Sequence, residues 1–218
     1  MRLLACADVH GDHEVYSWLA ETARRLKPDA LVLAGDLLGF PSGYESWERA
    51  QEADARAIAG LLAPAGVAVY FVMGNHDRIL ICSKSRTFVS LHERRIELGR
   101  YNLVGYAYSV RHRGGLFEKG EAEIAEDVGL LELWLDSNSV LVAHSPAWGI
   151  LDLGKNSARI GSLSLAALLE RRAVRAHVHG HSHEDFGRSD NHFNVACGRR
   201  KRAMVLDLES MTHDVVSG

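Results

Sequence analysis

The chain is poor in cysteine, and the three cysteines that it has lie far apart, at Cys6, Cys82 and Cys197. An odd number of widely separated cysteines forms neither a CxxC metal pair nor a disulfide framework. This pattern is typical of proteins from a reducing compartment, so we expect a cytoplasmic location.

Long apolar runs and a strong charge imbalance are also missing. No apolar stretch approaches the roughly 20 residues that a membrane span requires, so we expect no membrane partner. The opening MRLLACADVHG has one arginine and an apolar run that stops at Asp8, which indicates a buried strand rather than a signal peptide. The formal net charge of −3 provides no general attraction for nucleic acid or an anionic membrane. What remains is an ordinary globular composition, and we expect one domain over residues 1–218.

Histidine is abundant, with 12 residues, and a third of them lie in AHVHGHSHED, residues 176–185. The four histidines of this stretch occupy alternate positions: His177, His179, His181 and His183. Solubility does not require histidine at such density, whereas neutral imidazole is the commonest metal ligand among side chains. The stretch therefore points to metal binding.

Short apolar runs recur along the chain, and each stops abruptly at a residue that can ligate a metal. The residues at these stops are Asp8, Asp36, Asn75, His144 and His181. Runs of four to seven apolar residues bounded by glycine are typical of buried parallel strands. Open α/β sheets bind their ligands at the carboxyl ends of such strands.

Between these runs, helical spacing of apolar residues predicts helices over 12–26, 45–62, 121–135 and 162–172. Two other segments have the pattern of antiparallel hairpins. One is residues 94–109, with GR at its turn, and the other joins HFNVACG to AMVLDLES through the basic RRKR of residues 199–202.

The residues at and beside the strand ends comprise two carboxylates, one amide and four imidazoles: Asp8, His10, Asp36, Asn75, His144, His181 and His183. Because this set has no thiolate, it suits divalent Mn, Fe or Zn. Seven donors are too many for one tetrahedral ion, but they suffice for two ions about 3.5–4 Å apart with a bridging carboxylate. We expect Gly35, Gly74 and Gly180 to supply the positive φ angles of sharp turns before the ligands.

Five ordered blocks carry a resemblance to a known family: DVH (8–10), GD (35–36), GNHD (74–77), the histidine of AHSP (143–146) and GHSH (180–183). In order and type they resemble those of the calcineurin-like metallophosphoesterase superfamily, in particular its small, uncapped, bacterial-type members. The resemblance extends from residue 3 to the C-terminal strands. It implies an α/β (α+β) fold, a four-layer α-β-β-α sandwich with two mixed sheets.

The resemblance also implies roles for single residues. Asp8, His10 and His183 would hold one metal ion, and Asn75, His144 and His181 would hold the other. Asp36 would bridge the two ions. His76 would face the substrate, and Asp77 would orient its ring. The implied reaction is hydrolysis of a small phosphate ester by hydroxide generated at two divalent ions per chain.

Several alternatives remain open at the level of sequence. GDLLGF and GNHD differ from the GDxxDRG and GNHE of the protein phosphatases in this superfamily, and no tyrosine follows the GD block as in purple acid phosphatases. An open two-metal site favours a phosphodiester, with a phosphomonoesterase, a nuclease acting on nucleic acid, or a non-catalytic metal-binding scaffold as alternatives. The sequence does not determine the oligomeric state.

Some residues fit the family blocks less directly. Arg111 and Arg113 could contact a substrate phosphate or form a solvated basic turn, and Trp148 could line the site or belong to the core. His179 could orient a ligand, whereas His177 has the pattern of an ordinary strand residue.

Overall fold

Three strands and two helices alternate along the first third of the chain in the computed structural model, which describes residues 1–40, 42–81 and 85–218. Cys82 lies outside the described residues. The elements are β1 (Arg2–Cys6), α1 (His13–Leu26), β2 (Ala30–Ala34), α2 (Trp47–Leu62) and β3 (Ala68–Val72), with a 3-10 turn at Ala63–Ala65.

Capping side chains precede both helices. The Asp12 carboxylate accepts hydrogen bonds from the backbone N–H groups of Glu14 and Val15 at 3.0 and 3.2 Å. Ser46 accepts one from Arg49 in the same way at 3.3 Å. These bonds satisfy amide groups that the helix itself leaves unpaired.

The first sheet has the strand order β14-β13-β1-β2-β3-β4. Its central strands β1, β2 and β3 are parallel, while β13 pairs antiparallel with both β1 and β14. The strands not yet bounded are β4 (Phe88–Ser90), β13 (Arg202–Asp207) and β14 (Thr212–Ser217). Because β1, β2 and β3 run in the same direction, their carboxyl ends meet at one edge of the sheet.

The second sheet has the order β11-β12-β10-β9-β6-β5, and β6, β9, β10 and β12 run parallel. Its strands are β5 (Arg95–Leu98), β6 (Tyr101–Tyr106), β9 (Ser139–Ala143), β10 (Ala176–His179), β11 (Gly187–Ser189) and β12 (His192–Asn194). Two helices accompany it, α3 (Glu121–Leu131) and α4 (Leu163–Arg171). A small parallel pair, β7 (Ser109–Val110) with β8 (Glu118–Lys119), and 3-10 turns at Glu132–Trp134 and Lys155–Ser157 complete the described elements.

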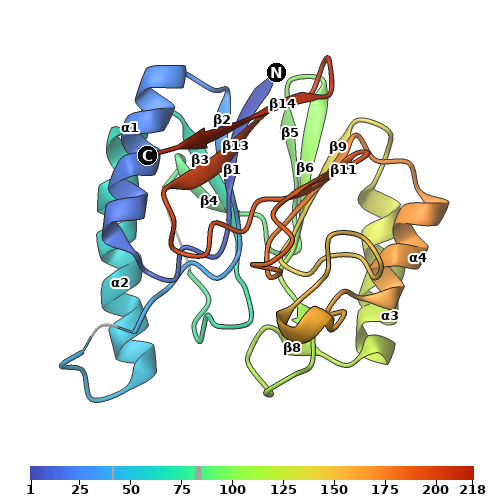
Figure 1. Ribbon diagram of the computed structural model, residues 1–218, viewed down its shortest axis with the longest axis horizontal. Coiled ribbons are helices and arrows are strands. Elements are labelled where there is room, and N and C mark those ends of the chain that lie inside the picture. The colour runs from blue at the N-terminus through green and yellow to red at the C-terminus, as the bar shows by residue number, and fades with distance from the viewer. Residues whose placement is uncertain (41, 82–84) are drawn as a thin grey trace.

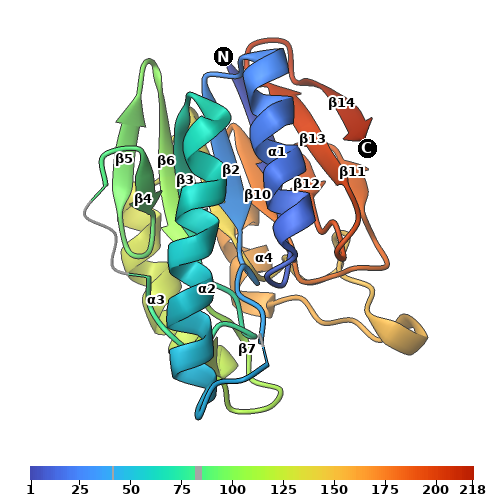
Figure 2. The same cartoon turned by 90° about the vertical axis from the view of Figure 1, so that its left-hand side faces the viewer.

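The two sheets face each other between two layers of helices, so the predicted four-layer sandwich is confirmed (Figure 1). Helices α1 and α2 cover the outer face of the first sheet (Figure 2), and α3 and α4 cover that of the second. One apolar core fills the space between the sheets and beneath α1 and α2, and a second lies beneath α3 and α4. In the described part of the chain, no helix combines the length and apolar character that a membrane crossing requires.

One predicted hairpin is confirmed and the other is wrong. β5 pairs antiparallel with β6 around Gly99 and Arg100, as the sequence indicates. β12 and β13, in contrast, do not pair: β12 lies beside β10 in the second sheet, and β13 lies beside β1 in the first. The segment between them carries the chain from one sheet to the other. Apolar patterning fixes which residues are buried in a strand but not which strand is its neighbour, so the pattern of a hairpin was misleading here.

Candidate metal centre

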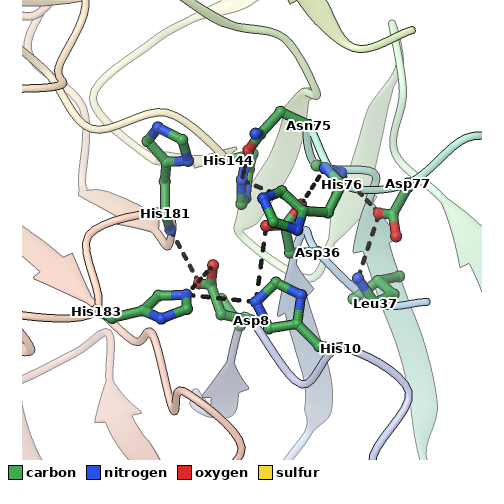
Figure 3. A network of polar contacts seen from close by, with 12 residues as sticks. Asp8, His10, Asp36, Leu37, Asn75, His76, Asp77, His144, His181 and His183 are labelled. Atoms are coloured by element: carbon green, nitrogen blue, oxygen red, sulfur yellow. Dashed lines mark hydrogen bonds and ion pairs between the residues drawn. The ribbon is translucent and has the colours of Figure 1, made fainter. Parts of the chain in front are cut away.

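The first group of candidate ligands forms where β1 meets the segment after β10. Asp8 Oδ1 lies 3.0 Å from His183 Nε2, and Asp8 Oδ2 accepts a hydrogen bond of 2.9 Å from the backbone N–H of His181. His10 Nε2 lies 3.4 Å from His183 Nε2. Ligand atoms of Asp8, His10 and His183 thus lie within 4.8 Å of one another, close enough to contact one ion (Figure 3).

The second group forms where β2, β3 and β9 end. His144 Nε2 lies 3.0 Å from Asn75 Oδ1 and 3.4 Å from Asp36 Oδ1. His144 Nδ1 is 3.0 Å from the carbonyl oxygen of Ala34 and donates to it. Because Nδ1 carries the proton, Nε2 is the free nitrogen, which is the arrangement by which proteins orient a ligating histidine.

Asp36 lies between the two groups. Its carboxylate is 3.9 Å from His10 Nε2 and 3.4 Å from His144 Nε2, and its Oδ1 accepts the backbone N–H of His76 at 2.8 Å. The His181 ring lies on the His144 side, with the two ring centroids 5.0 Å apart. The fold therefore brings all seven predicted ligands together, with Asp36 near the middle (Figure 3).

The protonation states of this cluster suit a divalent cation. Burial lowers the pKa of His10 to about 4 and that of His181 to about 3, so both imidazoles are neutral and can ligate. Burial and the charge of Asp8 raise the pKa of Asp36 well above its usual range. Burial would also raise the pKa of Asp8, but the hydrogen bond from His183 and the nearby histidines bring it down to about 2. The hydrogen bond with Asp8 raises the pKa of His183, so Asp8 has a partner there, whereas Asp36 is buried beside a second carboxylate. Divalent ions would supply the positive charge that Asp36 lacks.

Four of the candidate ligands have left-handed backbone conformations that side-chain-bearing residues rarely adopt. Their φ angles are 59° at Asp8, 51° at His10, 51° at Asp36 and 69° at His181. Such angles persist only where the surrounding structure enforces them, and they concentrate at functional sites. Each of these residues follows a strand closely, at the edge of the sheets where the candidate ligands meet (Figure 3).

The three glycines predicted to supply positive φ angles act mainly in another way. Only Gly35 has a positive φ, at 92°. A Cβ atom would lie 2.3 Å from His144 Nδ1 at Gly35, 2.3 Å from Asp36 Oδ1 at Gly74 and 2.4 Å from Asp8 Oδ2 at Gly180. Each glycine therefore leaves room for a ligand side chain from a neighbouring strand. The prediction of a left-handed conformation is wrong for Gly74 and Gly180, because close approach rather than a turn excludes a side chain there.

His76 and Asp77 leave the same turn in different directions. The His76 ring lines the cleft above the ligands, and its centroid lies 5.1 Å from that of His10. The fully buried Asp77 carboxylate accepts hydrogen bonds from the backbone N–H groups of Gly74, Leu37 and Leu38 at 2.8, 3.2 and 2.8 Å. The expectation that Asp77 orients the His76 ring is therefore corrected: Asp77 ties the turn after β3 to the segment after β2, because three backbone amides there have no strand partner.

Replacing Asp77 by alanine is expected to destabilise the protein by about 3 kcal/mol or more, because three buried N–H groups would lose their hydrogen-bond acceptor. Asp77→Asn keeps the shape and one acceptor oxygen and is expected to lose less. Urea unfolding of the metal-free forms measures both differences. A loss below about 1 kcal/mol for Asp77→Ala would contradict the role of a brace.

Glu118 belongs to the site, although no feature of the sequence pointed to it. Its Oε1 accepts a hydrogen bond from Asn75 Nδ2 at 3.4 Å, which turns the amide oxygen toward His144. Its Oε2 accepts four backbone N–H groups, from residues 112–115, at 2.6–3.1 Å. Burial would raise the pKa of Glu118, but these amides lower it to about 2. A lone glutamate outside any motif gives no signal in a single sequence, because its role depends on contacts distant along the chain.

His177 and His179 lie beneath the cluster rather than in it. Both are buried, their rings stack 4.8 Å apart, and His177 Nδ1 shares a hydrogen bond of 3.2 Å with His192 Nδ1. His179 Nδ1 donates to the carbonyl of Gly180, next to His181. His177 is thus a buried strand residue, and His179 contacts the backbone that leads into a candidate ligand.

A cleft of about 550 Å³ opens above the candidate ligands. Its floor includes His10, Asp36, Asn75, His181 and His183. Its walls come from two segments, 110–113 and 148–163. Arg111, Arg113 and Trp148, for which the sequence left two interpretations open, all line it.

Comparison with known proteins matches this arrangement. The family model of the calcineurin-like phosphoesterases matches residues 1–185. No curated protein sequence matches the chain. The structure is similar to that of the protein TT1561 from Thermus thermophilus, with a TM-score of 0.69 and 15% identity over 99% of this chain and 98% of that one.

Two further solved structures have the same fold. One of 16% identity superposes with a TM-score of 0.76 over 99% of this chain and 98% of the other. The other is a dimetal phosphatase from Danio rerio, with a TM-score of 0.58 and 13% identity over 90% of this chain and 86% of that one. At such low identity these likenesses concern the fold, whereas the family model spans most of the sequence. The chain belongs to the calcineurin-like phosphoesterase family, whose members are metal-dependent phosphoesterases.

Proposed function

We propose that this protein hydrolyses small phosphodiesters with two divalent ions, Mn, Fe or Zn, held at the floor of the cleft. One ion would be held by Asp8, His10 and His183, the other by Asn75, His144 and His181, and Asp36 would bridge them. The observation that carries the proposal is the convergence of these donors beneath an open cleft, with neutral imidazoles at His10 and His181 and an undercompensated buried carboxylate at Asp36. When bound, two such ions make hydroxide available near neutral pH for in-line attack on phosphorus.

The chain's own groups would position the ester and handle its charge. The His76 ring lines the cleft, and its backbone N–H is fixed to Asp36. Burial lowers the pKa of His76, which favours a neutral ring with one N–H to donate. The N–H of the neutral ring would donate a hydrogen bond to a phosphoryl oxygen. Protonation of the leaving oxygen would instead require the imidazolium form, which gives its proton to that oxygen and becomes the neutral ring, and the two roles differ in their dependence on the leaving group.

An open cleft favours a diester, because a diester needs room for a substituent on each side of phosphorus. The side walls extend beyond the ligand floor on two segments, so both substituents can be accommodated. The proposed reaction is carried out by residues 1–218 as one domain. The cytoplasmic location expected from the cysteine pattern stays a prediction.

Hydrolysis of bis(p-nitrophenyl) phosphate and of p-nitrophenyl phosphate, each with and without added Mn, tests this function. Turnover of the diester is expected to disappear after chelation and to return with Mn. A higher kcat/KM for the monoester would instead indicate a phosphomonoesterase. Fully loaded protein that hydrolyses neither ester nor any cyclic nucleotide would indicate a metal-binding scaffold.

A further inference from the structure

The cleft extends well beyond the candidate metal ligands, and the residues of its walls have no role in the hydrolysis described above. Two segments form these walls: residues 110–113, from the end of β7 into the loop before β8, and residues 148–163, from the loop after β9 to the start of α4. Both lie at the same end of the molecule, at the lower edge of Figure 1.

The first wall is held in place by Glu118. One oxygen of its carboxylate accepts hydrogen bonds from the backbone N–H groups of residues 112–115, and the other accepts one from the side-chain amide of Asn75. The carboxylate that fixes this loop therefore also contacts a candidate metal ligand. Arg113, carried by this loop, lies close enough to His76 for its charge to contribute to the lowered pKa of that histidine.

The second wall is held by a different buried carboxylate. Asp152, fully buried, accepts the backbone N–H groups of Gly149 and Gly161 at 3.1 and 3.3 Å and pairs with Arg159. The wall is also tied to the ligand-bearing turn after β10, because the Ser182 hydroxyl donates to the carbonyl of Leu153.

The same wall contains two consecutive left-handed residues, Asn156 with φ of 59° and Ser157 with φ of 58°. Residues with side chains adopt such angles only where their surroundings enforce them. Lys155, which lines the cleft, directly precedes this pair.

The cations of the two walls are of two kinds. Arg111 and Arg159 are paired, with Glu123 and Asp152. Arg113 and Lys155 line the cleft, are exposed, and have no carboxylate partner among the residues that the structure describes.

The acidic groups outside the metal cluster do not offset these cations. Two such groups line the cleft, Glu121 and Glu184. The Glu121 carboxylate accepts hydrogen bonds of 3.0 and 3.1 Å from the backbone N–H groups of Leu163 and Ser164 at the start of α4. Among the residues that the structure describes, the cleft lining outside the metal cluster therefore has two unpaired positive charges, Arg113 and Lys155, against one unpaired acid, Glu184.

An apolar surface lies in the same walls. Trp148 is 43% exposed and Leu163 is 56% exposed, although both are large apolar side chains. With Ile160, they line the cleft on the side of the second wall. An exposed tryptophan in a cleft provides a flat surface on which an aromatic ring can stack.

We propose that the substrate is a phosphodiester in which one substituent carries a flat ring, stacked on Trp148, and a second phosphate, bound by Arg113 and Lys155. This proposal rests on the proposed function, because it assigns the walls of the same cleft. The two free cations would bind the second anion through charge-assisted hydrogen bonds, with a bidentate option at the guanidinium. The rigid anchoring by Glu118 and Asp152 reduces the entropy that such binding costs.

Two chromogenic esters that differ by one phosphate test the second-anion subsite. Thymidine 5′-(p-nitrophenyl phosphate) has the ring and one charge, and its 3′-phosphorylated analogue adds the second anion. The protein is expected to hydrolyse the analogue with a kcat/KM about tenfold higher, the effect of one good charged contact. Equal values for the two esters would overturn the proposal.

Matched variants locate the effect in the walls. Arg113→Ala with Lys155→Ala is expected to bring the ratio of the two kcat/KM values close to one. The ratio is the readout because the loss of Arg113 also acts on the pKa of His76 and therefore on both esters alike. Arg24→Ala with Arg25→Ala removes the same charge from exposed positions of α1 and is expected to keep the preference. A preference that survives the wall double variant, or that vanishes with the α1 double variant, would show that net charge rather than this subsite is responsible.

Binding measurements separate failure of the subsite from failure of the proposed function. By calorimetry, the wild type is expected to bind thymidine 3′,5′-bisphosphate about tenfold more tightly than thymidine 5′-phosphate, and the wall double variant to bind both equally. This readout requires no turnover. Hydrolysis of neither ester together with preferential binding would contradict the hydrolase while keeping the subsite, whereas equal binding by the wild type would overturn the subsite.

The Trp148 contact has its own readout. Trp148→Ala is expected to raise the KM of both thymidine esters about tenfold, because stacking of a base on an aromatic side chain contributes roughly 1–3 kcal/mol. The KM for methyl p-nitrophenyl phosphate, which lacks the base, should stay the same. An equal rise for all three esters would contradict stacking and indicate a disturbed cleft.

Discussion

Replacing His76 by alanine is expected to lower turnover of a phosphodiester with a poor leaving group by about 10²–10⁴-fold, the usual contribution of a positioned proton donor. The metal content should stay at about two ions per chain, since none of the proposed ligands is removed. The orientations of Asn75 and His76 explain why turnover should fall while the metal content is kept. Asn75 turns its amide oxygen toward His144, whereas the His76 ring lines the cleft.

The leaving group identifies what His76 does. A nitrophenolate leaving group needs little protonation, so the rate loss on bis(p-nitrophenyl) phosphate should be smaller than on an alkyl ester if His76 is a general acid. If His76 only stabilises the phosphoryl oxygens, the loss should be similar for both esters. Turnover and metal content of the same preparation are measured together.

Two variants serve as controls for His76→Ala. Asn75→Ala, one residue away, is expected to lose metal together with activity. His213→Ala, on β14, removes an imidazole far along the chain from every candidate ligand and is expected to change neither. A His76→Ala protein that has lost its metal would show that His76 is a ligand, a possibility raised by the closeness of its ring to His10 and Asp36.

The sequence was sufficient to predict that the candidate ligands converge, and the reason is topological. Five apolar runs each end at a polar residue, and parallel strands bring their carboxyl ends together. The side chains of Asp8, Asp36 and His144 therefore meet even though they are far apart in the chain. Such local patterns also fixed the helices, because their apolar spacing and caps are properties of short segments.

Contacts between distant segments could not be predicted in this way. The role of Glu118 depends on a bond to Asn75, and that of Asp152 on a loop that folds back onto its carboxylate. Nothing in the sequence near either residue encodes these partners. The prediction that Asp77 orients the His76 ring failed for a similar reason. Three backbone N–H groups from two segments, rather than the His76 ring, donate to the Asp77 carboxylate.

The strand partners of the C-terminal region were misjudged because two apolar strands on either side of a basic turn satisfy the pattern of a hairpin. Ala7 bridges Ala196, between the two strands, so the chain passes beside Asp8 as it changes sheets. This crossing places Cys197 against the carbonyl of Asp8, with both Cys6 and Cys197 buried and unpaired by disulfides. The presence of a strand in each of the two segments was predicted correctly, and only the pairing between them was not.

Replacing Asp36 is expected to have the largest effect on metal binding of any single change in the cluster. Asp36 lies near both His10 and His144, so its loss removes a donor from each proposed ion and leaves two cations with less negative charge between them. We expect Asp36→Asn and Asp36→Ala to weaken Mn binding by about 100-fold or more, beyond the effect of removing a partner that only orients a ligand. Metal content after dialysis measures the loss.

The metal content of the Asp36 variants is compared with that of single variants at other positions. Asp8→Ala and His144→Ala are each expected to lose chiefly one ion. Asp77→Asn alters a buried carboxylate of the neighbouring turn that faces away from the cluster, and it should retain both ions. An Asp36→Ala protein that keeps two ions per chain would decide against a bridging role.

The stability of the metal-free protein should increase when Asp36 is replaced by asparagine, although metal binding weakens. The reason is that the charged carboxylate of Asp36 is unfavourable in the metal-free fold. Burial and the charge of Asp8 raise its pKa above the unfolded value of about 3.9, so the folded protein holds this proton more tightly than the unfolded chain does. The metal-free protein therefore loses stability as pH rises from the unfolded pKa toward the folded one, and Asp36→Asn removes this loss. At pH 7 we expect the metal-free Asp36→Asn protein to have a higher Tm than the metal-free wild type, and a given concentration of Mn to raise the Tm of the wild type more than that of the variant. A lower Tm for the metal-free variant would show that Asp36 stabilises the fold by itself and that its position does not reflect a demand for cations.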